Sequence, residues 1–128
     1  MLPGSIVREA IERTTIDRAM RVTTCPTATI HAPIDIVWRL LTDPDEYVHW
    51  GGHVVAVDPP GTLRPGQRIV LRERSFGRWF AVRFDVRAVR DVPTRSIRVD
   101  VHLPFGVVNR ELISCAALGP ESTFVSFN

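Results

Sequence analysis

The sequence contains no lysine, only two cysteines and no long apolar run. All sixteen basic residues are therefore arginine, which excludes a Schiff-base lysine and the phosphate-binding lysine of Walker-type nucleotide sites. Cys25 and Cys115 alone cannot supply a disulfide scaffold or a structural zinc site. Because no stretch reaches 18 apolar residues, we expect no membrane-spanning helix.

The remaining composition is that of one ordinary globular domain. The 128 residues are 45% hydrophobic and 23% charged, which argues against disorder and against a coiled coil. The net charge is +2, and the arginines form no dense run, so nucleic-acid binding is not indicated. The N-terminus lacks the apolar segment of a signal peptide. We therefore expect a cytoplasmic protein, and nothing in the sequence calls for a cofactor.

Hydrophobic periodicity predicts an α+β domain over residues 23–128, preceded by an N-terminal segment, 1–22, with a short helix at 5–13. A strand at 23–31 is followed by two short helices at 34–41 and 45–50. Turn signals rich in Pro and Gly then separate six further strands, predicted at 53–58, 67–74, 80–88, 95–103, 107–118 and 123–127. Strands joined by such short turns should pair as an antiparallel meander with the helices on one face.

Alternation along the strands predicts which side chains point inward. Glu73 follows Ile69 and Leu71 on the inward side of its strand. The next two strands give a longer inward set, namely Phe80, Val82, Phe84, Val86, Ala88, Ile97, Val99, Val101 and Leu103.

The length of the loop at 104–106 determines which side chains of the following strand point inward. A three-residue loop with Gly106 in the left-handed conformation places Asn109 opposite Val101 and Glu111 opposite Val99. A two-residue loop would point Arg110 inward instead.

The segment from Ala28 to Trp50 carries a recognisable motif. It combines a strand, Ala32-Pro33, a helix with Val37-Trp38, then Asp43-Pro44 and a closing Trp50. This pattern resembles the opening of the START-like, Bet v 1-like superfamily, and most nearly its polyketide cyclase/dehydrase and lipid-transport group. The later Leu63-Arg64-Pro65-Gly66-Gln67 is similar to that family's turn into its third strand.

The resemblance implies a helix-grip fold, in which a curved seven-stranded antiparallel sheet wraps a long C-terminal helix around a cavity for apolar small molecules. This sequence stops at Asn128, directly after the seventh predicted strand, so that helix is absent. Exposing one large inward side chain costs about 1.5–3 kcal/mol, so something must cover this face. Truncation of a longer chain ranks first. The alternatives are the N-terminal helix and a second copy of the chain, as a homodimer.

Within such a cavity, Glu73 and Glu111 are the candidate catalytic residues, because burial raises a carboxyl pKa toward the range of general acid–base catalysis. Asn109 could hold a substrate carbonyl. The competing interpretation places these groups at a solvated rim, paired with arginines. The candidate ligand-binding residues are Trp50, Phe76, Trp79, Phe80, Phe84, Val99, Val101 and Asn109.

The histidines offer little for a metal site. His49 and His53 are four residues apart, but Gly51-Gly52 breaks the helix between them, and a third ligand such as Asp43 or Asp45 would be needed. We therefore predict no metal.

Three functions remain open from the sequence. The first is binding of an apolar small molecule, lipid-like or polyketide-like. The second is a cyclase/dehydratase-type enzyme in the same cavity, and the third is a regulatory or toxin-like protein-binding module. The inward face carries no dense polar cluster, which counts against the enzyme, and the uncovered sheet face favours a partner.

Overall fold

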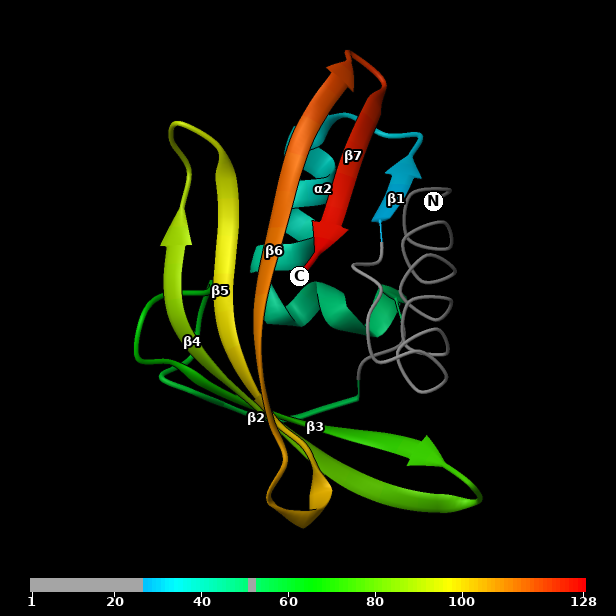
Figure 1. Ribbon diagram of the computed structural model, residues 1–128, viewed down its shortest axis with the longest axis vertical. Helices are drawn as coiled ribbons and strands as arrows, with labels where there is room; N and C mark the ends of the chain where they lie inside the picture. The colour runs from blue at the N-terminus through cyan, green and yellow to red at the C-terminus, as the bar shows by residue number, and fades with distance from the viewer. Residues whose placement is uncertain (1–26, 51–52) are drawn as a thin grey trace.

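Seven strands form one antiparallel sheet in the order β1-β7-β6-β5-β4-β3-β2 (Figure 1). This computed structural model describes residues 27–50 and 53–128, so the predicted helix at 5–13, Cys25 and the boundary at residue 22 lie outside the described residues. The elements are β1 (Thr27–Ile30), α2 (Ile34–Thr42), η1 (Pro44–Trp50), β2 (His53–Asp58), β3 (Arg68–Ser75), β4 (Arg78–Arg90), β5 (Arg95–His102), η2 (Pro104–Gly106), β6 (Val108–Gly119) and β7 (Ser122–Phe127).

The strand order confirms the predicted antiparallel meander and the α+β class. Strands β2 to β7 pair in sequence order, each with the next. The exception is β1, which lies at the other edge and pairs with β7, with Thr27 opposite Ser126 and Ile30 opposite Thr123. The chain therefore crosses the sheet once, between β1 and β2, and α2 and η1 form that crossing.

Helix α2 begins directly after Pro33, whose carbonyl accepts hydrogen bonds from the amides of Ile36 and Val37. Its apolar residues fall on one side, and Val37, Leu40 and Leu41 are buried. It ends where Pro44 starts the 3₁₀ helix η1, because a proline disfavours helical backbone in the residue before it.

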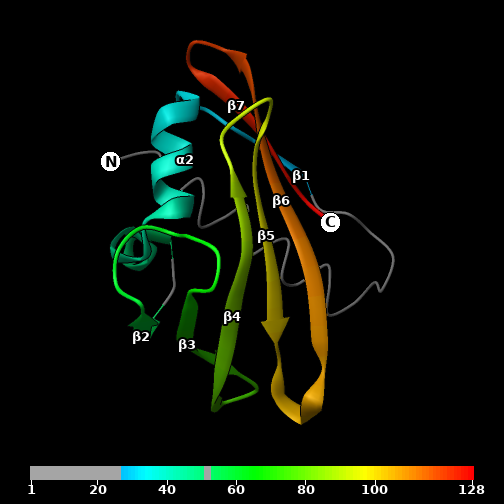
Figure 2. The same ribbon diagram turned by 90° about the vertical axis from the view of Figure 1, so that its left-hand side faces the viewer.

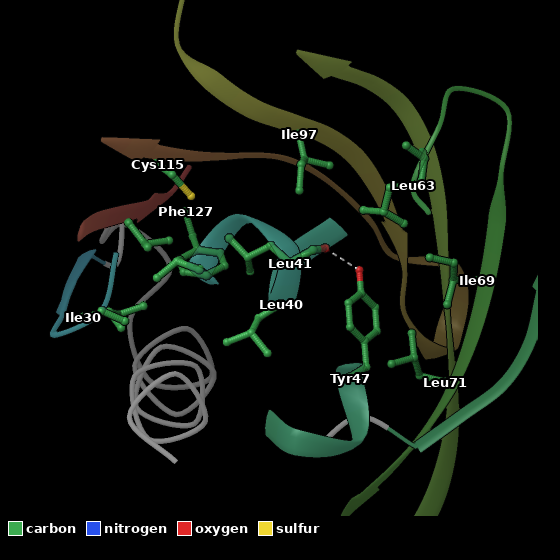
Figure 3. Close-up of a cluster of buried hydrophobic side chains, with 14 residues drawn as sticks. Ile30, Leu40, Leu41, Tyr47, Leu63, Ile69, Leu71, Ile97, Cys115 and Phe127 are labelled. Carbon is green, nitrogen blue, oxygen red and sulfur yellow. Dashed lines mark hydrogen bonds between the residues drawn. The ribbon is translucent and has the colours of Figure 1, made fainter. Parts of the chain in front are cut away.

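Both helices lie on the same face of the sheet (Figure 2), here called the helix-side face. The main core fills the space between them and the strands (Figure 3). Ile30 and Phe127 lie at one end of this core, and Ile69 and Leu71 lie at the other. The hydroxyl of Tyr47 donates a 2.8 Å hydrogen bond to the carbonyl of Leu41, which joins η1 to α2. Burial, and secondarily the charge of Asp43, raises the pKa of Tyr47 above its ordinary value.

Gln67 ties the turn before β3 to the sheet. Its side chain is buried, and its Nε2 donates to the carbonyls of Pro59 at 2.8 Å and Gly61 at 3.0 Å. A side-chain amide can supply two donors to a turn whose own carbonyls have no strand partner. Gln67 therefore stabilises the long connection between β2 and β3.

One inward prediction is wrong. The pairing of β4 with β5 shifts between Val86 and Ala88, so Arg87 is an extra residue in β4. Such a bulge reverses the facing of every residue beyond it. Val89, not Ala88, therefore packs against the main core.

Candidate functional site

The helix-side face continues beyond the helices. In Figures 1 and 2 the lower parts of β4, β5 and β6 extend past α2 and η1. On β4 and β5, Val82, Val99 and Val101 form a second buried apolar group, here called the valine cluster, beside the main core. Phe84 and Ile113 contact both groups, and Leu103 contacts the valine cluster alone.

The strand register explains this grouping. Phe84 lies opposite Val101, and Val86 lies opposite Val99, so the side chains of β4 and β5 share one face. On the next strand, Val101 lies opposite Asn109 and Val99 lies opposite Glu111. The predicted inward facing of Asn109 and Glu111 is therefore confirmed, and Arg110 belongs to the other face.

The loop at 104–106 has the three residues expected, and the amide of Leu103 donates to the carbonyl of Val107 at 2.8 Å. Gly106 has φ +75°, which is the left-handed conformation predicted for it. Phe105 has φ +67°, and no sequence signal indicated a second left-handed residue in this loop.

The polar residues of this face differ in environment. Glu111 is buried, whereas Asn109 is exposed. Glu73 lies opposite Phe80, near the free end of the β3–β4 hairpin, and its side chain keeps substantial exposure. Partial desolvation by the surrounding protein nevertheless raises the pKa of Glu73. The valine cluster is thus a buried apolar group with polar residues at its margins.

Glu73 and Glu111 do not come together. Three strand spacings of about 4.8 Å separate β3 from β6, and six residues at about 3.4 Å each separate their rows along the sheet. The two residues are therefore roughly 25 Å apart along the sheet, which is too far for paired acid–base action on one small substrate.

The predicted aromatic wall is only partly assembled. Phe80 and Phe84 lie on the helix-side face as expected. Phe76 instead lies at the tip of the β3–β4 hairpin, fully exposed. Trp79 lies on the opposite, outer face, where its ring contacts Arg72 and His53. The side chain of Trp50 lies outside what the structure describes.

A charged network occupies the outer face of β3, β4 and β5. Asp85 accepts a 3.1 Å hydrogen bond from Arg68, and its other oxygen lies 3.5 Å from Arg83 and 3.0 Å from Nε2 of His102. Arg83 also donates to Nδ1 of His102 at 3.1 Å. Beside it, Arg87 donates to Asp100 at 2.8 Å. No pattern in the sequence indicates that these residues form one network.

The electrostatics around Asp85 are dominated by its neighbours. Partial burial acts to raise its pKa, but the hydrogen bond from Arg68 and the charges of Arg83, Arg68 and His102 together lower it. Two hollows of about 180 and 360 Å³ adjoin this face; the smaller has a mixed polar and apolar lining, and the larger is lined mainly by charged and polar groups. The lining of the larger hollow does not suit an apolar ligand.

No metal site is found within residues 27–50 and 53–128, since no three His, Cys, Asp or Glu side chains there are grouped to hold an ion. His49 lies 3.3 Å from Glu46, and His53 lies edge-on to Trp79. Burial raises the pKa of the Cys115 thiol to about 12, so this cysteine is not an activated nucleophile.

Comparison with known proteins adds a fold relationship. No family model matches the sequence, and no curated protein matches it. Among solved structures, the chain is similar to protein Ms6760 from Mycobacterium smegmatis, with a TM-score of 0.58 and 21% sequence identity. The match covers 82% of this chain and 75% of that chain. At this identity the similarity concerns the fold. No helix in the described part of the chain is long and apolar enough to cross a membrane.

Proposed function

We propose that this chain is a START-like protein with a helix-grip fold, and that it binds an apolar small molecule, lipid-like or polyketide-like, against the valine cluster. The observation that carries the proposal is the division of one sheet face into two apolar regions. The main core is filled by α2 and η1, whereas the valine cluster lies on strands that extend beyond both helices.

The chemistry of the margins supports a ligand that is mostly apolar. Phe80 and Phe84 add aromatic side chains on one side of the valine cluster, and Asn109 adds an exposed amide on the other. A few polar groups around an apolar lining are typical of small-molecule sites, where they orient the ligand. The wide separation of Glu73 and Glu111 favours a carrier over a cyclase.

The test is binding of a fluorescent fatty acid, cis-parinaric acid, to the purified chain. We expect saturable binding, and we expect Phe80→Ala to weaken it about tenfold, because the variant removes a large apolar contact. The matched control is Trp79→Ala, which removes an aromatic side chain from the outer face of the same strand and should leave Kd unchanged.

Two outcomes would reject the proposal. One is the absence of saturable binding by the folded protein. The other is equal loss of affinity in Phe80→Ala and Trp79→Ala, which would place the fatty acid away from the helix-side face.

A further inference from the structure

Two hairpins end at the same extremity of the molecule, and each carries a phenylalanine at its tip. The β3–β4 and β5–β6 hairpins both reach the lower end in Figures 1 and 2. Phe76 is 100% exposed and Phe105 is 97% exposed. Val107 and Val108, which follow Phe105, are also about half exposed. This extremity, here called the hairpin end, therefore presents large apolar side chains directly to solvent.

Neither phenylalanine is explained by its turn. Phe76 has φ +53° and Phe105 has φ +67°, a backbone conformation that disfavours residues with a Cβ. Glycine or asparagine would satisfy both turns better, and a serine or aspartate would suit exposure to water better. Two positions thus carry a bulky aromatic residue against the preference of both backbone and solvent.

The charge of the hairpin end has one predominant sign. Residues 72–80 and 101–110 contain Arg72, Arg74, Arg78 and Arg110 against a single acid, Glu73. The guanidinium of Arg72 lies 4.8 Å from the ring centre of Trp79, and that of Arg74 lies 5.9 Å from it. Trp79 itself is 49% exposed. Aromatic rings beside arginines are typical of protein surfaces at the headgroup level of a bilayer.

The opposite end of the molecule has a different character. Val92 and Leu118 are exposed there, but Asp91 and Glu121 lie in the same loops. Arg95 is paired with Asp35 at 2.7 Å and Asp91 at 2.8 Å. Arginines thus outnumber acidic residues more strongly at the hairpin end, although Asp100 lies opposite Arg110 at its boundary.

We propose that the hairpin end docks on the surface of an anionic lipid bilayer. Phe76 and Phe105 enter the boundary between headgroups and acyl chains, Trp79 lies at headgroup level, and the four arginines contact lipid phosphates. Apolar side chains and basic residues act together in such peripheral binding, because burial and charge attraction add. This inference rests on the hairpin tips and is independent of the proposed ligand site.

The test is cosedimentation with vesicles of phosphatidylcholine alone and of phosphatidylcholine with one quarter phosphatidylglycerol. We expect binding to the anionic vesicles, weakened by added salt, and a fall of at least about tenfold in the double variant Phe76→Gly/Phe105→Gly. Glycine accepts both left-handed positions, so this variant should keep its fold and its melting temperature. The control Leu118→Ala, which removes an exposed apolar side chain from the opposite end, should bind like the unmodified chain.

The proposal is overturned if the folded chain sediments no more with anionic vesicles than without vesicles, or if the double variant binds as well as the unmodified chain. Self-association through the hairpin end is tested in parallel by analytical ultracentrifugation. A dimer that becomes monomeric in the double variant, without vesicle binding, would assign the hairpin end to contact between two copies of the chain.

Discussion

Asp85 is the residue on which the charges of the outer face converge. Arg68, Arg83 and His102 all lie within 3.5 Å of its carboxylate oxygens, and they come from three neighbouring strands. A single exposed ion pair contributes little, but a carboxylate that contacts two arginines and a histidine ring is held by several interactions at once. Asp85 therefore links β3, β4 and β5 on the outer face of the sheet.

We expect Asp85→Asn to lower the free energy of unfolding by about 1 kcal/mol at pH 7. The pKa of Asp85 is lowered in the folded state, so its contribution is complete above the unfolded-state value, near 3.8. The contribution is then lost as the pH falls through the lower, folded-state pKa. Urea unfolding at pH 7 and at progressively more acidic pH should show the difference between variant and parent shrinking in acid.

The comparison for this prediction is Glu121→Gln, which removes an exposed charge from the β6–β7 turn. This variant should change stability by less than about 0.5 kcal/mol. A difference for Asp85→Asn that stays constant down to pH 2 would contradict the electrostatic explanation.

At the scale of single residues, the sequence predicts which side of the sheet a side chain points to better than it predicts which side chains lie near one another. The facing of Asn109 and Glu111 followed from one loop length and the two-residue period of strands. The separation of Glu73 from Glu111 needed the order of four strands and their stagger, which no local pattern contains. The sequence predicts Phe76 as a ligand-binding residue, but its place in a two-residue turn leaves its side chain fully exposed.

At the scale of elements, β4 shows the limit of periodicity. Its residues 80–86 alternate as predicted, and the bulge at Arg87 then reverses the facing. A bulge has no necessary sequence signal. Val86, Ala88 and Val89 are all apolar, so their residue types do not show which of them point to the core. Helix α2 was predictable to within one residue, because proline marks its start and its end and the apolar stripe is clear.

The bulge gives a paired prediction. Val89→Ser should destabilise the fold by about 2 kcal/mol, because Val89 packs against the main core. Ala88→Ser should stay within about 0.5 kcal/mol, because Ala88 lies on the outer face. Thermal unfolding of both variants measures the contrast. Strict alternation predicts the reverse order, so a larger loss in Ala88→Ser would argue against the bulge.

At the scale of the molecule, the sheet is completed by its most distant pairing. Strand β1 is held by β7, and the hydroxyl of Thr123 donates a buried 2.8 Å hydrogen bond to the carbonyl of Ala32 across 91 residues of sequence. Each of the other strand pairs joins neighbours in sequence. Local hairpins form sooner than contacts that close long loops. The pairing of β1 with β7, here called the β1–β7 seam, should therefore form late in folding.

We expect Thr123→Val to cost about 1–2 kcal/mol, because it leaves the buried carbonyl of Ala32 without this donor. For a contact formed late, the loss appears as unfolding accelerated roughly 5- to 30-fold, with the folding rate nearly unchanged. Val86→Ala, in the β4–β5 pairing, should instead slow folding. Stopped-flow chevron plots separate these effects, and slower folding in Thr123→Val would contradict the late seam.

The same seam has a consequence during synthesis on the ribosome. Among the described elements β1 and α2 emerge first, and the strand that pairs with β1 follows about 90 residues later. At about 5–20 residues per second, this delay is roughly 5–20 s. Until β6 and β7 have emerged, Val37, Leu40 and Leu41 lack the strands that α2 contacts in the finished fold. We therefore expect the nascent chain to expose apolar side chains during synthesis, and its yield in cells should depend on translation speed as well as on the stability of the finished fold.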